Sequence, residues 1–462
     1  MKNKPHILIL MPDQMRADCM GCAYNELIKT PNLDRLAGEG VHFTHANTNC
    51  TVCMPARASL VSGLYSHNHG MWGISGELPA SDETFFHHLQ QAGYFTAHIG
   101  KSHYYCDSVH MKDREPYMHS RGLEYVHETQ GTKGVLLTES YFTDYLKEKG
   151  LLSVMREDYI LRKKNNCPAH PSPLSVEDCL DGYVGRRAVD FVSEYKDERP
   201  MCLFVGFPGP HVFRDPSGKY AGMYKPQDMP ESIPAGEIPG WLPDSARERM
   251  VGGQERFRRI SGEHLAKIKA SYYGKISLID YWIGEILRSF EKKGWLDDLF
   301  VVFCSDHGEM LGDHGLLAKT VFYESSVRIP FIIRHPLSIK PGQKNDSLVE
   351  TIDIFPTLLE VAGAEPSHRC LGKSLYQTVN NPGSIHRKGV LSEVYSTTFN
   401  FMVRTRRYKY AVEKGGEPIF LYDLEKDPDE QVNLAGSDKA KNLESEARDE
   451  LLRLLTSAQW TM

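Results

Sequence analysis

The sequence predicts an α/β fold in which a large, mostly parallel sheet is flanked by helices and followed by a smaller antiparallel α+β subdomain. Two observations support this prediction. Over roughly the first 370 residues, short and continuously apolar runs alternate with helical stretches, which is typical of parallel strands covered on both faces. Beyond that point, apolar runs follow one another with only short polar turns between them. We therefore expect a main α/β domain over residues 1–370 and a C-terminal α+β subdomain over residues 371–462.

The main sheet is expected to contain strands at the apolar runs His6–Met11, Thr96–Ile99, Met201–Phe207, Leu299–Cys304 and Pro330–Arg334. The longest predicted helix covers Glu263–Lys293, where apolar side chains recur every three or four residues and form one buried stripe. Ser261 is placed to cap the start of this helix, and Gly294 is placed to end it.

The C-terminal part is expected to contain strands at Gly389–Tyr395, Phe401–Val412 and Pro418–Leu424, followed by a charged helix over Lys439–Ser457. Two polar stretches, residues 107–199 and 214–259, show no clear periodicity, and the second is rich in proline and glycine. Such insertions often determine substrate specificity, because loops vary while the scaffold that carries them stays fixed.

Composition excludes some classes of function. The chain of 462 residues has a formal net charge of −6, which argues against a nucleic-acid-binding protein. An anionic ligand would therefore need a local pocket of positive charge. No segment reaches the roughly 20 apolar residues of a membrane helix, so we expect no membrane span. The apolar run at the N-terminus is shorter than most signal-peptide cores and is predicted as the first strand.

The ten cysteines are irregularly spaced in a long chain, which favours reduced thiols and a cytoplasmic location over a disulfide framework. One alternative is a four-cysteine zinc site formed by Cys19, Cys22, Cys50 and Cys53. The gap between these two pairs exceeds the usual ~15–20 residues, so the spacing disfavours zinc.

Cys53 has a more specific context. Pro55 suits the first turn of a helix, so Cys53 is expected at a helix N-terminus, close to free N–H groups and the positive end of the helix dipole. Arg57, one turn further on, would reach the same place. Such a position stabilises a thiolate or a bound anion. A buried structural cysteine before a helix is the alternative, because free cysteines are often buried.

The stretch Cys53-Met-Pro-Ala-Arg57, followed by Leu60-Val-Ser-Gly63, resembles the signature of the sulfatase family, within the alkaline phosphatase superfamily. The segment Phe420–Ala435 resembles the C-terminal element of the same family. The resemblance implies that a separate maturation enzyme oxidises Cys53 to formylglycine. It also implies that residues 1–370 form the catalytic domain.

Two further motifs follow predicted strands and resemble the metal ligands of sulfatases. Asp13 and Gln14 follow the first strand, where many sulfatases have two aspartates, and Asp306 and His307 follow Leu299–Cys304. Ligands at these strand ends would lie at the carboxyl edge of the sheet. The resemblance implies one divalent metal ion, held by Asp13, Gln14, Asp306, His307 and the formylglycine at Cys53. Oxygen-rich coordination favours calcium, with magnesium or manganese as alternatives. The roles of Asp313 and His314 stay open.

Four basic residues match further positions of the family: Lys101 and His103 in a Gly-Lys-x-His sequence, His211 in a Pro-His sequence, and Lys319. Together with Arg57, they would supply the local positive pocket that the acidic chain otherwise lacks.

The resemblance implies hydrolysis of a sulfate monoester. One hydroxyl of hydrated formylglycine would attack sulfur, and His211, with Lys319, would assist the leaving alcohol. His103, with Lys101, would then take a proton from the second hydroxyl, and sulfate would be released. The substrate would be a small-molecule or saccharide sulfate ester. A phosphonate monoester or phosphodiester hydrolase of the same superfamily is the nearest alternative, and an inactive anion-binding protein is a more distant one.

Overall fold

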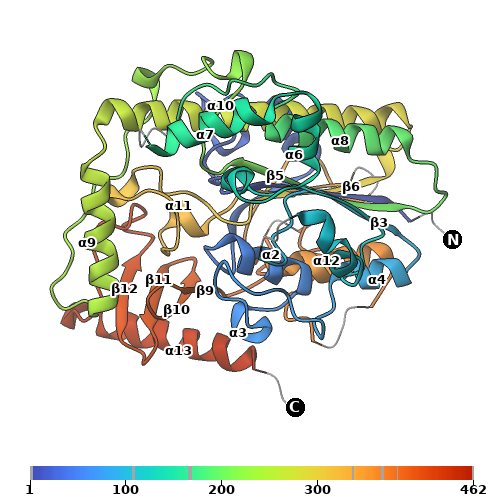
Figure 1. The fold of residues 1–462 in the computed structure, drawn as a ribbon. Helices are drawn as coiled ribbons and strands as arrows, with labels where there is room; N and C mark the ends of the chain where they lie inside the picture. Colours follow the sequence, from blue (N-terminus) through green and yellow to red (C-terminus); the bar gives the residue numbers. More distant parts are fainter. Residues whose placement is uncertain are drawn as a thin grey trace.

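The computed structural model describes residues 4–106, 110–164, 169–335, 338–365, 369–381 and 383–459. An eight-stranded sheet passes through the middle of the molecule with helices on both sides, and a separate four-stranded sheet lies near the C-terminus (Figure 1). The predicted α/β fold with a smaller antiparallel C-terminal part is therefore confirmed. The domain boundary near residue 370 stays a prediction.

The main sheet has the strand order β4-β3-β5-β1-β6-β7-β2-β8, and only β7 is antiparallel to its neighbours. Its strands are β1 (His6–Asp13), β2 (Val41–Asn47), β3 (Phe95–Gly100), β4 (Tyr125–Glu128), β5 (Met201–Pro210), β6 (Leu299–Cys304), β7 (Phe331–Arg334) and β8 (Gln343–Glu350). The central strand β1 pairs with β5 on one side and with β6 on the other. Because these three strands are parallel, their carboxyl ends meet at one edge of the sheet.

Two hydrophobic cores cover the two faces of the sheet. Along β1, Leu8 and Leu10 join one core, while Ile7, Ile9 and Met11 join the other. The first core is covered by α1 (Pro31–Glu39), α8 (Leu180–Glu194) and α10 (Gly262–Lys292), and the second by α2 (Cys53–Ser62), α4 (Phe85–Gln91) and α12 (Ile354–Ala362). Strands with both faces buried are continuously apolar, which is why the sequence identified them.

Seven further helices are present in the described residues. They are α3 (Ser66–His69), α5 (Glu115–His119), α6 (Tyr141–Glu148), α7 (Leu152–Lys164), α9 (Asp244–Arg258), α11 (Glu324–Val327) and α13 (Lys441–Ser457). Short 3₁₀ turns are η1 (Gly21–Ala23), η2 (Met111–Arg114), η3 (Thr132–Leu136), η4 (Gly218–Tyr220), η5 (Pro226–Asp228), η6 (Leu296–Asp298), η7 (Asp313–Gly315), η8 (Thr351–Asp353) and η9 (Asp438–Ala440).

The second sheet is antiparallel, with the order β12-β11-β10-β9, and α13 packs against it through Ala447, Leu451 and Leu454. Its strands are β9 (Gly389–Tyr395), β10 (Phe399–Thr405), β11 (Tyr408–Glu413) and β12 (Pro418–Asp423). The single strand expected over Phe401–Val412 is wrong: the chain turns back after Thr405 and forms the hairpin β10–β11. The polar pair Arg406-Arg407 lies at this turn, inside what the apolar pattern presents as one run.

The five predicted strands of the main sheet are all present, and the predicted long helix is α10. The hydroxyl of Ser261 accepts a hydrogen bond from the backbone N–H of His264 at 3.2 Å, which confirms the N-cap. Gly294 follows the helix with φ of 74°, a left-handed conformation that favours glycine. The sequence missed β2, β4 and β8, and α9 occupies a stretch that was expected to be loop-like. Polar strands such as Gln343–Glu350 and a helix with two adjacent glycines give weak periodic signals.

Among the described residues, no helix combines the length and the apolar character that crossing a bilayer requires. The nine cysteines that the structure describes have free thiols, and Cys167 falls outside the described residues. The cytoplasmic location stays a prediction.

Candidate active site

Residues from five separate segments meet at the carboxyl edge of the main sheet. Asp13 is the last residue of β1, Asp306 and His307 follow β6, and Lys101 follows β3. His211 directly follows β5, and Cys53 is the first residue of α2. The parallel arrangement of β1, β3, β5 and β6 thus gathers groups that are up to about 300 positions apart in the sequence.

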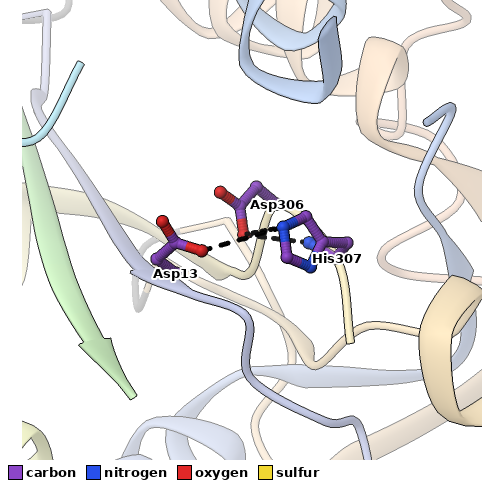
Figure 2. Close-up of side chains that lie close together, drawn as sticks. All are labelled: Asp13, Asp306 and His307. Atoms are coloured by element: carbon purple, nitrogen blue, oxygen red, sulfur yellow. Dashed lines mark hydrogen bonds and ion pairs between the residues drawn. The ribbon is translucent and has the colours of Figure 1, made fainter. Parts of the chain in front are cut away.

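Three of these residues form a candidate metal site. Side-chain atoms of Asp13, Asp306 and His307 all lie within 4.8 Å of one another, and all three residues are fully buried (Figure 2). His307 Nε2 lies 3.7 Å from a carboxylate oxygen of each aspartate. The other ring nitrogen, Nδ1, is 2.9 Å from the carbonyl of Gly308 and donates to it, which leaves Nε2 as the acceptor nitrogen of the ring.

Two buried oxygen atoms at this place have no hydrogen-bond partner among the described residues: Asp13 Oδ1 and Gln14 Oε1. The amide nitrogen of Gln14 donates to Glu309, so the amide oxygen is the free end of that side chain. Unsatisfied buried oxygens are costly unless a ligand completes them. Two carboxylates, one amide oxygen and one imidazole therefore fit a hard divalent cation.

Arg57 and Lys101 fix the geometry of the carboxylates. Arg57 is almost completely buried; its Nε donates to Asp306 Oδ2 at 2.8 Å, and its Nη1 donates to the Lys101 carbonyl at 2.6 Å. The Lys101 ammonium forms an ion pair with Asp13. Burial alone would raise the pKa of Asp13, but the surrounding cations, with Lys101 first, hold that pKa well below its usual range. Asp13 is therefore an anion that is ready to bind a metal.

Cys53 lies at the N-terminus of α2 with 1% of its surface exposed. Burial raises the pKa of its thiol, but the positive charges of Lys319, Lys101 and His103 outweigh burial and lower that pKa well below the usual value. The interpretation of Cys53 as a reactive or anion-binding position is consistent with this geometry.

The two predicted histidines also lie here. His103 has φ of 59°, and its buried Nδ1 has no hydrogen-bond partner among the described residues. The Nδ1 of His211 donates to the carbonyl of Val212 at 2.8 Å. Burial and then the charge of Lys319 lower the pKa of His211 well below its usual value. Lys319 itself donates to His307 Nε2 at 2.8 Å. All the predicted basic residues are thus brought together.

One buried carboxylate of this site was missed by sequence reasoning. Glu309 is fully buried and accepts hydrogen bonds from Arg214 at 2.6 Å, from Gln14, and from the backbone N–H groups of Leu311 and Ala318 at 3.0 and 2.5 Å. Glu309 positions the Gln14 amide and balances the charge of Arg214. Its place two residues after His307 was the only available signal.

Asp313 and His314 lie outside the metal cluster. Asp313 accepts from Arg16 at 2.7 Å and from Ser325 at 2.6 Å, and the His314 ring stacks on Tyr323 at 3.8 Å. These contacts favour structural roles. Among the residues that the structure describes, the Asp13, Asp306 and His307 group alone has the spacing of a metal site, and it contains no cysteine. The four-cysteine zinc site therefore gains no support.

The fold and the site together define a class: α/β proteins that gather a candidate metal site and basic residues at the carboxyl edge of a mostly parallel sheet. Sequence comparison gives the family. The family model described as "Sulfatase" matches residues 5–364, and the model "N-sulphoglucosamine sulphohydrolase, C-terminal" matches residues 312–457. The chain belongs to the sulfatase family.

Individual relatives agree with this assignment. An arylsulfatase of Clostridium perfringens is 33% identical over 451 residues, covering 95% of this chain and 92% of that protein. The structure of a phosphonate monoester hydrolase of Agrobacterium radiobacter superposes with a TM-score of 0.81 at 23% identity, covering 98% of this chain and 96% of that one. A structure solved with its substrate D-glucosamine-2-N,6-O-disulfate superposes with a TM-score of 0.77 at 22% identity, covering 99% and 98%. At these identities, the two structures show the fold alone.

Proposed function

We propose that this protein hydrolyses a sulfate monoester, using one divalent metal ion and a formylglycine formed from Cys53 by a maturation enzyme. The observation that carries the proposal is that Cys53, at a helix N-terminus, lies close to a candidate metal cluster and to five basic side chains, those of Arg57, Lys101, His103, His211 and Lys319. Sulfatase family membership and the arylsulfatase relative support the choice of ester.

Asp13, Gln14, Asp306 and His307 would hold the metal ion, together with the side chain at position 53. Their mostly oxygen donors favour calcium, and magnesium or manganese would suit the same set. When bound, the ion would neutralise charge on the sulfate group and make sulfur easier to attack. Arg57 and Lys101 each bind one oxygen of a carboxylate, Asp306 Oδ2 and an oxygen of Asp13, and Asp13 Oδ1 is left without a hydrogen-bond partner among the described residues.

The side chains around position 53 divide the remaining work. Lys101 and Lys319 bring positive charge to the sulfuryl oxygens, which otherwise repel a nucleophile. Hydrated formylglycine at position 53 would supply one hydroxyl as the nucleophile and a second hydroxyl whose proton must be removed for sulfate to depart and the aldehyde to re-form. We assign that second proton to His103, which contacts position 53, and protonation of the leaving alcohol to His211. Because burial and then the neighbouring cations lower the pKa of His211, it would gain its proton only when the negative sulfate is bound.

The substrate class is proposed as a small-molecule or saccharide sulfate ester. The related structure with a glucosamine disulfate as its substrate supports a sugar sulfate. The phosphonate monoester hydrolase with the same fold keeps the alternative substrate class open. The matured protein should be tested on an aryl sulfate and on an aryl phosphonate monoester with the same leaving group. A higher kcat/KM on the sulfate supports the proposal, and a higher kcat/KM on the phosphonate replaces it.

A further inference from the structure

Gly131 and the start of η3 lie against the candidate active site. A Cβ at Gly131 would lie only 3.2 Å from Lys101 Nζ, so the backbone of this segment touches the site directly. The hydroxyl of the next residue, Thr132, donates to the carbonyl of Val212, which is the neighbour of His211. Lys133 comes next and is exposed, so it lies at the rim of the site.

Lys133 brings a positive charge that no acidic group of the described residues balances. Among the described residues, no hydrogen bond or ion pair reaches its ammonium group. Partial burial lowers the pKa of Lys133, and the positive charges of Lys319, Arg214 and Lys163 lower it further. Lys163 belongs to α7, whose Arg156 donates to the carbonyl of Val135 at 3.0 Å and so joins that helix to η3.

Other cations near the site are compensated. Arg214 pairs with Glu309 at 2.6 Å, and the fully buried Lys275 pairs with Asp181 and Asp215 at 2.6 and 2.7 Å. Lys133 and Lys163 have no such acidic partner in the part of the chain that the structure describes. Cations that repel one another at the rim of a site destabilise the fold, and a bound anionic ligand would relieve this repulsion. The positive charge here is local, because the chain as a whole is acidic.

We propose that Lys133, assisted by Lys163, binds a second anionic group of the substrate, beside the sulfate ester that is cleaved. This inference rests on the proposed function and narrows its substrate class. The preferred substrates would be sulfate monoesters that carry another sulfate, carboxylate or phosphate group on the same small molecule.

The test compares two phenyl sulfates, one with a meta carboxylate and the other with a meta carboxamide of nearly the same shape. For each protein variant, the ratio of kcat/KM on the two esters measures preference for the second negative charge. The intrinsic reactivity of the esters and the fraction of matured enzyme cancel when these ratios are compared between variants. The variants are Lys133→Gln, Lys163→Gln and Lys133→Glu, with Lys292→Gln at the exposed end of α10 as the matched control.

We expect Lys133→Gln to lower the preference for the carboxylate ester roughly three- to fivefold, the size of a partly exposed ion pair. Lys163→Gln should lower it less, and Lys133→Glu should make the carboxamide ester the better substrate. The preference of the unchanged protein should shrink as salt is added, because these charges are near solvent.

An unchanged preference in Lys133→Gln would overturn this inference while leaving sulfate hydrolysis in place. An equal loss in Lys292→Gln would also overturn it, because the effect would then follow net charge and not position. Turnover of neither ester by protein whose Cys53 has been converted would instead refute the proposed function, and the inference with it.

Discussion

Replacing Glu309 by glutamine tests whether this buried carboxylate organises the site. In the native protein, Glu309 accepts from the Arg214 guanidinium at 2.6 Å, from Gln14 and from two backbone N–H groups. Glutamine has nearly the same shape but no charge, so Arg214, with 3% of its surface exposed, loses its counter-charge. The NH₂ group of the new glutamine would also lie opposite an N–H donor that hydrogen-bonds to the carboxylate in the native protein. Breaking a buried pair from one side costs ~3–5 kcal/mol.

We expect Glu309→Gln to lower the free energy of unfolding by about 3 kcal/mol, since the remaining amide oxygen still accepts part of the hydrogen bonds. Urea denaturation would measure this loss, with Glu26→Gln, at an exposed position, as the control that should change little. The variant should also bind its metal ion more weakly, because Gln14 is no longer held, and a titration with a chelator would show this. A loss below about 1 kcal/mol, the size of an ordinary point mutation, together with unchanged metal affinity, would refute the organising role.

Four further predictions follow from the same structure. Cys53→Ala should abolish turnover and Cys22→Ala should leave it close to normal, as steady-state assays would show; near-normal rates in Cys53→Ala would end the formylglycine proposal. Removal of the metal ion by a chelator should abolish activity and leave the circular dichroism spectrum intact, because the large core does not depend on one ion; global unfolding would contradict this. His211→Ala should lose more rate on alkyl than on aryl sulfates, whereas His103→Ala should release a burst of one alcohol per active site and then turn over slowly. Equal losses of His211→Ala on both esters, without a burst in His103→Ala, would show that these roles are misassigned. The Asp280→Asn variant tests how stability depends on pH. Burial raises the pKa of Asp280 from 3.8 to about 6. The stability that the protonated group contributes at low pH is therefore lost as the pH rises through 6. Between pH 3.8 and about pH 6, the free energy of unfolding of the native protein should therefore fall by roughly 3 kcal/mol relative to that of the variant. Equal pH dependence of the two free energies of unfolding would contradict this.

Much of the site was predictable because its residues follow strong local signals. Asp13, Lys101 and Asp306 each come at or directly after the end of an apolar strand, and parallel strands bring their carboxyl ends together. The proline after Cys53 marked the helix start. Such a local pattern predicts that a residue lies at the carboxyl edge of the sheet, even when the residues that it contacts there are not known.

The rest depended on contacts between distant parts of the chain. Gln14 and Glu309 are 295 positions apart, and only the folded structure shows that one orients the other. The strands β2 and β8 contain too many polar residues for their periodicity to reveal them. Lys133 lies in a polar insertion without a repeating pattern, so its position beside the site could not be predicted.

The central claim is that a formylglycine at position 53 is the nucleophile of a sulfatase. The most direct measurement is mass spectrometry of the peptide that contains Cys53, from protein produced together with a formylglycine-generating enzyme and shown to be active on an aryl sulfate. We predict a peptide in which the CH₂–SH group has become an aldehyde, with an extent of conversion that parallels the specific activity of each preparation. Full activity in a preparation whose Cys53 is entirely an unmodified thiol would contradict the claim.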